Sequence, residues 1–200
     1  MKEDQWEKLE KKIMEREETE WRKEAAKSPK LELYTELRNT VYQKKIKRNL
    51  PSYLVDTDID DKHELGRIIM TKLRTGTNML RVETGRWERI NSKVEGKNVR
   101  IKMPREQRIC KLCVMNKVED ETHFLVECEA YQNRRKTMEK EIQLYLTKDK
   151  LIWSTMSDKE KAKWLVGDDK LKGRVTKRDT IKGYIADIYQ QRQRLVHEPD

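Results

Sequence analysis

Three cysteines and one histidine lie within the stretch RICKLCVMNKVEDETHFLVEC, from Arg108 to Cys128, and the chain has no other cysteine. Cys110, Cys113, His123 and Cys128 follow the spacing C-x2-C-x9-H-x4-C. Tetrahedral zinc takes four thiolate or imidazole ligands at about 2.0 to 2.3 Å, and two residues between thiolates let a tight turn present both sulfurs to one ion. We therefore predict one structural zinc ion held by these four side chains.

The two ligand pairs must come from different elements. RICKLCVM can form a small hairpin around the first two cysteines, and Asp120 can cap a short helix that carries His123 near its start. Cys128 follows just over a turn later, so the end of this helix must adapt for both side chains to converge. Phe124 and Leu125 lie between these ligands, and we expect them to pack the zinc module against its neighbour.

Other kinds of chemistry remain open for the cluster. The four residues could be unligated cysteines and a core histidine. A catalytic zinc would need an open coordination position and a general base, for which Glu121 and Glu127 are near in sequence, but four protein ligands fill the ion. A Cys–His nucleophile pair is a further alternative, although thiolates held by zinc are poor nucleophiles. We expect no enzymatic activity.

The composition favours a polyanionic partner. The 200 residues carry a net charge of +10, with 41% charged and only 35% hydrophobic residues, so the core is small and a metal crosslink would help it. Nucleic acid is the first partner to expect and an anionic membrane surface the second. We see no membrane span, and MKEDQWEKLEKK lacks the apolar core of a secretory signal. The prediction is an intracellular protein, nuclear or cytoplasmic.

Most of the excess charge lies between Gly66 and Arg108. This segment has twelve lysines and arginines against four glutamates, a net charge of +8, and its glycines at 76, 85 and 96 break it into turns and short elements. A solvated face is the alternative to phosphate binding here. The candidate nucleic-acid-binding residues are Arg67, Lys72, Arg74, Arg81, Arg86, Arg89, Lys93, Lys97, Arg100, Lys102 and Arg105.

The remaining elements have helical patterns. Strong helix formers with opposite charges three or four apart predict a long charged helix from Lys2 to Lys27. Its short stripe of Trp6, Leu9 and Ile13 would dock on the body or on a protein partner; a frayed arm is the alternative. DTDIDD (56–61) lacks the glycine and the final glutamate of a calcium loop, and its acids favour the start of the next helix. Further helices are expected at 31–50, 63–74, 131–146, 157–166 (with Ser157 and Glu160 as a capping box) and 175–196.

The predicted fold is mainly α, a helical domain with a small CCHC zinc module of a short hairpin plus a helix, and a long charged N-terminal helix. The predicted divisions are a charged helical arm (1–28), a helical basic region (29–108), the zinc module (109–136) and C-terminal helices (137–200).

Three stretches resemble one family: KLRTGTNMLRVETGRW (72–87), RICKLC (108–113) and VEDETHFLVECEAYQNRRK (118–136). They are similar to the region that follows the polymerase in non-LTR (LINE-type) retrotransposon reverse transcriptases, where a basic stretch leads into a CCHC zinc finger. The resemblance covers Leu31 to Leu195. It implies that the four residues of the cluster are the zinc ligands and that this tail helps hold template RNA or target DNA. Arg74, Arg81, Arg86 and Arg89 fall in the matching basic stretch.

The chain departs from the family in what it lacks. It has no polymerase palm, no paired aspartates of the F/Y-x-D-D type and no endonuclease domain, so we expect no polymerisation by this chain alone. A fragment, a remnant and a host protein built from such a tail remain open.

Three functions follow from these observations. The first is a zinc-stabilised module that binds RNA or DNA largely without regard to sequence, with no small-molecule substrate. The second is an interaction subunit in which zinc only stabilises the fold, while the N-terminal helix and the region of Trp153 and Trp164 dock on proteins. A core short of phenylalanine explains the five tryptophans equally well. The third, a zinc hydrolase or degenerate nuclease, needs an open coordination site or clustered acids, and the sequence offers neither.

Overall fold

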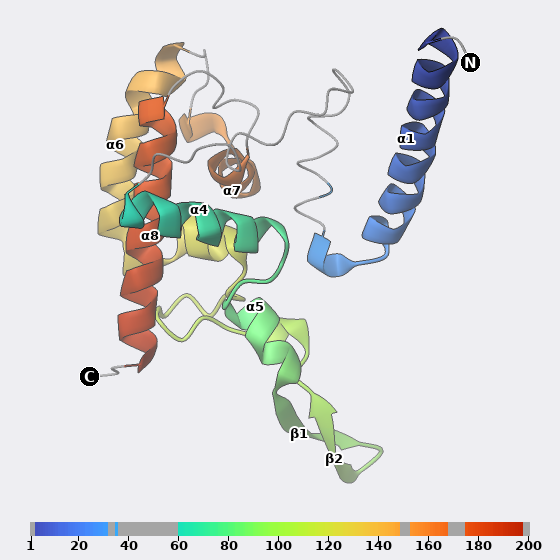
Figure 1. Cartoon of the computed structure of the whole chain (residues 1–200). Helices are drawn as coiled ribbons and strands as arrows, with labels where there is room; N and C mark the ends of the chain where they lie inside the picture. Colours follow the sequence, from blue (N-terminus) through green and yellow to red (C-terminus); the bar gives the residue numbers. More distant parts are fainter. Residues whose placement is uncertain (1–2, 32–34, 36–59, 149–152, 168–174, 198–200) are drawn as a thin grey trace. The chain divides into compact units, whose positions relative to one another are not determined.

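The computed structural model describes residues 3–31, 35, 60–148, 153–167 and 175–197 (Figure 1). The chain divides into two compact units, Met1–Ile46 and Lys47–Asp200. Most of the predicted helix at 31–50 and most of the DTDIDD segment lie outside the described residues.

The first unit contains the predicted charged helix. Helix α1 spans Glu3–Ala26, and a short 3-10 helix follows at Pro29–Leu31. Ion pairs between residues four apart join Arg16 to Glu20 at 3.1 Å and Arg22 to Glu18 at 2.9 Å, the pattern that supports an isolated helix. The stripe of Trp6, Leu9 and Ile13 is exposed. The prediction of a long charged N-terminal helix is confirmed.

The second unit is built around three helices. These are α4 (Asp61–Arg74), α6 (Gln132–Lys148) and α8 (Val175–His197). Figure 1 shows α6 and α8 running side by side with α4 crossing α8, and both pairs are in contact. The apolar faces of the three helices meet in a core that includes Ile69, Leu73, Ile142, Ile181, Ile185 and Ile188.

Two shorter helices complete the unit. Helix α5 spans Arg81–Thr84, and α7 spans Asp158–Val166. Short 3-10 helices lie at Gly85–Trp87, Arg105–Gln107, Glu129–Tyr131 and Trp153–Thr155. Helix α7 brings Leu165 and Val166 into the core.

The predicted helix starts are visible at two caps. Asp60 accepts a hydrogen bond from the His63 amide at 2.9 Å and so caps α4. Ser157 and Glu160 form the predicted capping box at the start of α7, where each side chain accepts from the other's backbone amide. Asp60 is the described residue of the DTDIDD segment that performs the capping role we expected of its acids.

The tryptophans proposed as a docking region are part of the interior. Trp153 and Trp164 are buried and pack edge to face with ring centroids 5.6 Å apart. The Trp153 indole donates to Glu139 on α6 at 3.0 Å. The prediction that they dock on partners is wrong, because their rings supply core volume in a chain with a single phenylalanine.

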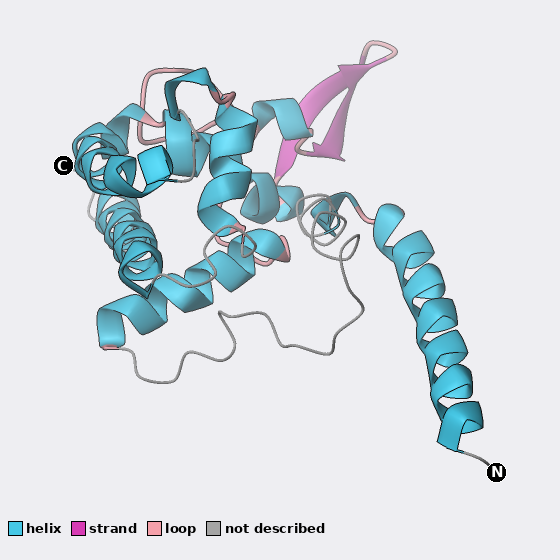
Figure 2. Cartoon of the chain, turned by 90° about the horizontal axis from the view of Figure 1, so that it is seen from above, coloured by secondary structure: helices cyan, strands magenta, loops and turns pink. Residues whose placement is uncertain are grey.

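A two-stranded antiparallel sheet extends away from the helices of its unit, as Figures 1 and 2 both show. Strand β1 spans Arg89–Val94 and β2 spans Lys97–Lys102, with Arg89 opposite Lys102 and Lys93 opposite Asn98. The two turn residues Glu95 and Gly96 both have positive φ, +50° and +78°, as a tight hairpin turn of the I′ type requires.

The prediction of a mainly α fold is confirmed. The hairpin lies in the segment for which turns and short elements were predicted. Strands outside the cysteine region were not expected. The hairpin expected around the cysteines is reduced to a single antiparallel bridge between Ile109 and Val118. No helix among the described residues is long and apolar enough to cross a membrane.

Candidate metal centre

The first ligand pair lies on a closed loop. The Ile109–Val118 bridge joins the two ends of this loop, the Cys110 amide donates to the Lys117 carbonyl at 2.9 Å, and the turn contains Asn116 at φ +57°. The Leu112 amide points at the Cys110 sulfur at 3.4 Å. The loop therefore holds both cysteines of the C-x2-C pair on one side of a tight turn.

The second pair lies on a short helical segment that Asp120 starts, as predicted. The Asp120 carboxylate accepts from the His123 amide at 3.0 Å. The segment then widens, because the Cys128 amide donates to the His123 carbonyl at 2.8 Å, five residues back, in the π-helical turn His123–Glu127.

This wide turn explains how His123 and Cys128 converge. In an α-helix, five residues advance by about 500°, which would leave the two side chains about 140° apart around the axis. The π-helical turn has more residues in each turn, and Cys128 leaves it with an extended ψ of 124°. This widened turn is the change at the end of the helix that the spacing of His123 and Cys128 requires.

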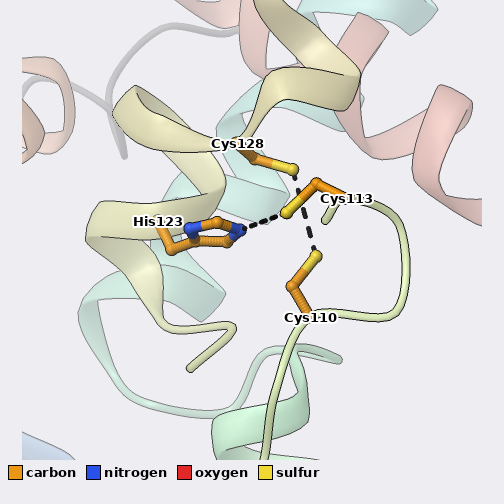
Figure 3. Close-up of side chains that lie close together, drawn as sticks. All are labelled: Cys110, Cys113, His123 and Cys128. Carbon is orange, nitrogen blue, oxygen red and sulfur yellow. Dashed lines mark hydrogen bonds between the residues drawn. The ribbon is translucent and has the colours of Figure 1, made fainter. Parts of the chain in front are cut away.

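The four ligand atoms converge on one point from the loop and the helical turn (Figure 3). All lie within 4.8 Å of one another, with 3.9 Å between the sulfurs of Cys110 and Cys128 and 3.4 Å between the Cys113 sulfur and His123 Nε2. Tetrahedral bonds of about 2.3 Å to sulfur and about 2.0 Å to nitrogen place such pairs about 3.8 and 3.5 Å apart. The cluster can therefore hold one metal ion.

The Cys110 and Cys128 sulfurs lie within hydrogen-bonding distance of each other. The hydrogen bond from the Cys128 thiol lowers the pKa of Cys110 to about 4, and the same pairing raises the pKa of Cys128. Burial raises the pKa of Cys113. None of the three cysteines is in a disulfide. A divalent cation that binds all three as thiolates would displace the thiol protons, so binding is expected to weaken in acid.

Glu127 orients the imidazole. Its carboxylate lies 3.3 Å from His123 Nδ1 and also pairs with Lys117 at 3.1 Å. An Nδ1–H that donates to this carboxylate leaves the Nε2 lone pair directed at the three sulfurs. From the sequence, Glu127 was a candidate only for a general base. Its position four residues after His123, one helical turn later, was the signal for this supporting role.

Glu121, the other acid near the ligands in sequence, accepts a hydrogen bond from the Asn78 side chain at 2.8 Å. Burial raises its pKa. Its contacts connect the helical turn to the segment that follows α4, so it belongs to the packing around the site.

The helical turn is held against the rest of its unit by a buried apolar pair. Phe124 and Leu125 are fully buried, as predicted, and Phe124 packs edge to face on Tyr131 with centroids 5.4 Å apart. The Tyr184 hydroxyl on α8 donates to the Leu125 carbonyl at 2.6 Å, and the Arg135 guanidinium on α6 donates to the Cys128 carbonyl at 3.0 Å. Two of the three main helices thus fix the turn that carries His123 and Cys128.

The predicted basic residues fall into two groups. Those of the first group make contacts within the fold. Arg74 is buried and donates to the Val166 carbonyl. Four others pair with acids: Arg67 with Glu64, Arg81 with Glu88, Arg86 with Glu83 and Arg105 with Asp120. Lys72 is half-buried on α4.

The second group lies on the hairpin. Its members are exposed, and none has an acidic partner among the residues that the structure describes: Arg89, Lys93, Lys97, Arg100 and Lys102. The hairpin was missed in the sequence, although the alternation of RINSKV and KNVRIK around a two-residue Glu-Gly loop was a signal that could have found it.

Comparison of the chain with protein-family models, with curated proteins and with solved structures finds no match in any of the three. The resemblance to reverse transcriptase tails stays a prediction.

Proposed function

We propose that this chain is a zinc-stabilised nucleic-acid-binding module related to the tail of non-LTR retrotransposon reverse transcriptases. The observation that carries the proposal is the group of five exposed hairpin cations without acidic partners in the described part of the chain. Exposed charges of one sign that no contact within the fold requires are typical of a surface that binds a polyanion.

The donor set supports zinc as the metal. Three thiolates and one imidazole in a compact group suit a tetrahedral, thiophilic ion, and harder ions such as Mg²⁺ and Ca²⁺ prefer oxygen ligands. Four protein ligands fill the coordination sphere, so the ion is structural. It fastens the cysteine loop to the helical turn whose Phe124 and Leu125 reach the core.

We expect the binding to act through charge. Lysine and arginine contacts to phosphates release counterions, and five such contacts predict a slope of about −4.5 in log K against log salt on double-stranded DNA. We expect neither polymerase nor hydrolase activity of this chain alone. The proposal places it in a reducing compartment, the nucleus or the cytoplasm, where thiolates stay reduced.

Binding of the whole chain to single- and double-stranded RNA and DNA at about 50 and 200 mM salt tests this function. For five contacts, the affinity for double-stranded DNA should fall roughly 500-fold over this range. Absence of binding at the lower salt, or an affinity that salt leaves unchanged, would contradict the proposal.

A second function is favoured by one observation, the exposed stripe of Trp6, Leu9 and Ile13 on α1. In that case the stripe docks on a protein partner and the metal serves only the fold. Trp6→Gln with Ile13→Gln would then abolish stoichiometric co-purification of a protein, with the metal content and the nucleic-acid affinity unchanged. If the double variant still co-purifies with that protein, α1 is not the docking element.

A further inference from the structure

The β1–β2 hairpin has two unlike faces. Side chains alternate along a strand, and the register places cross-strand partners on the same face. One face, here called the apolar face, combines Ile90 with Ile101 and Ser92 with Val99, and it carries Lys97 beside the turn. The other face carries only cationic and amide side chains and is here called the cationic face: Arg89, Asn91, Lys93, Asn98, Arg100 and Lys102.

The two faces have different tasks in the structure. The apolar face supplies the β-branched cross-strand pair Ile90–Ile101, which stabilises the hairpin itself, and both residues are half-buried. All six residues of the cationic face are exposed. Arg81, by contrast, lies against Glu88 and Met103 at the root of the hairpin and anchors it. The root and the apolar face therefore stabilise the hairpin. The exposed cationic face has no such role, which indicates that it binds a ligand.

The dimensions of the hairpin indicate which nucleic acid it fits. Paired strands lie about 4.8 Å apart, so two strands with their side chains form a ribbon of the width that the B-DNA major groove, about 12 Å wide, admits. The major groove of A-form RNA is deep and too narrow for side chains to read. A ribbon with one face of cations and amides is complementary to the first groove and excluded from the second.

We propose that the cationic face enters the major groove of B-form DNA and that double-helical DNA is the preferred ligand of this chain. This inference rests on the nucleic-acid-binding function proposed above. The lysines and arginines neutralise phosphates along the groove walls. The amides of Asn91 and Asn98 lie opposite Arg100 and Lys93, where each pair can donate to the base edges at the groove floor.

The tight turn favours this mode of binding. Positive φ at both Glu95 and Gly96 gives a two-residue loop, so the tip of the ribbon is no wider than its two strands. A wide loop at this end would prevent entry into a groove.

A charge-matched pair of variants tests the proposal by fluorescence anisotropy at one salt concentration. Lys93→Gln with Arg100→Gln removes two charges from the cationic face. The control, Lys136→Gln with Lys140→Gln, removes two exposed charges from α6, which lies outside the hairpin. Both double variants of the whole chain are compared with the unsubstituted chain on a 20-base-pair DNA duplex, the matching RNA duplex and the single DNA strand.

The unsubstituted chain should bind the DNA duplex at least about tenfold more tightly than the other two probes. The face variant should lose about 10- to 100-fold in affinity for the DNA duplex, and the control less than about threefold. Equal losses in the two variants, or equal binding of the three probes, would overturn the assignment to the ribbon and leave the proposed function standing. If the unsubstituted chain binds none of the probes, the proposed function fails as well.

A second measurement does not depend on variants. Guanine N7 lies in the major groove, so the bound chain should protect it from methylation by dimethyl sulfate. Protection of adenine N3 in the minor groove without protection of guanine N7 would overturn the proposal. Stronger binding of the single strand, with loss of affinity in Trp87→Ala, would assign the site to base stacking on that residue, whose side chain is 81% exposed at the root of the hairpin.

Discussion

At the residue scale, the cluster depends on a carboxylate that is not itself a ligand. Glu127 contacts His123 Nδ1, and Lys117 in turn pairs with Glu127. Residues that orient a ligating histidine contribute to affinity by fixing its tautomer and ring direction before the metal arrives. The helical turn places this acid four residues after the histidine, on the same side.

Glu127→Gln should therefore lower zinc affinity about 10- to 100-fold, because the neutral amide holds the imidazole less firmly. Competition of the variant with a chromophoric chelator measures the change. Glu129→Gln is a matched control, since this acid follows Cys128 directly in sequence and is exposed. A zinc affinity of Glu127→Gln within twofold of the unsubstituted chain would remove Glu127 from this role.

A second residue-scale feature is a buried ion pair. Arg192 on α8 donates to Glu119 through two nitrogens, at 2.7 and 2.9 Å, and both side chains are buried. Glu119 also accepts from the Arg81 amide at 2.9 Å. The pair thus ties α8 to the segment between the two ligand pairs and to the start of α5.

Arg192→Met should destabilise the unit by about 3 to 5 kcal/mol, because it leaves the Glu119 carboxylate buried without its cation. Adding Glu119→Gln should recover part of this loss, since an amide is less costly to bury than a carboxylate and still accepts from Arg81. Urea unfolding of the single and double variants measures both effects. A double variant less stable than Arg192→Met would contradict the explanation.

The ligand residues were accessible from the sequence, and the ion pair between Arg192 and Glu119 was not. The four ligands share one stretch, so spacing alone brings them into consideration. Arg192 and Glu119 are 73 residues apart, and only the packing of α8 brings them together. Which basic residues are buried and which are exposed could not be predicted for the same reason. Charge alone does not distinguish Arg74, which is buried, from Arg100, which is exposed.

At the scale of elements, helices α4 and α8 cross with their backbones nearly touching. A Cβ at Gly66 would collide with the Lys182 carbonyl, so only glycine allows this approach. Gly183, the next residue on α8, is different, because a Cβ there would lie 3.7 Å from the nearest atoms, at the ends of the His63 and Lys62 side chains.

Gly66→Ala and Gly183→Ala should have opposite effects on stability. The first forces the two helices apart and should cost about 1 to 3 kcal/mol or more. The second fits its space and should stabilise α8 by up to about 1 kcal/mol through helix propensity. Thermal unfolding of the two variants measures the difference. Equal effects of the two substitutions would show that the helices do not cross at Gly66.

The helices were predictable as elements, and the signal for the hairpin was weaker. Apolar residues at helical spacing mark α4 and α8, and the pair Ser157 and Glu160 marks the start of α7. The hairpin has few apolar residues, and its Glu-Gly turn differs from the Asn-Gly and Asp-Gly turns that signal such a structure. The sequence identified the hairpin cations as candidates. Only the pairing register of β1 and β2 shows which of them share one face.

At the scale of the whole molecule, apolar packing does not hold the cysteine loop to the core of the second unit. The cysteine loop has few buried side chains of its own, and Val114 is 92% exposed. The loop is held where the cluster joins it to the helical turn, which packs through Leu125 on α8. A metal ion held by the cluster would therefore complete the fold between the core helices and the segment that leads to the hairpin.

The most direct test of this account is the metal content of the purified chain, measured by native mass spectrometry and elemental analysis and compared with its melting temperature. We predict one zinc ion per chain, its loss in Cys113→Ser or after chelation, and a clear fall in melting temperature with that loss. Lys111→Ala, an exposed substitution in the same loop, should keep both the zinc ion and the melting temperature. A chain that carries no zinc and melts at the same temperature with and without chelator would contradict the account.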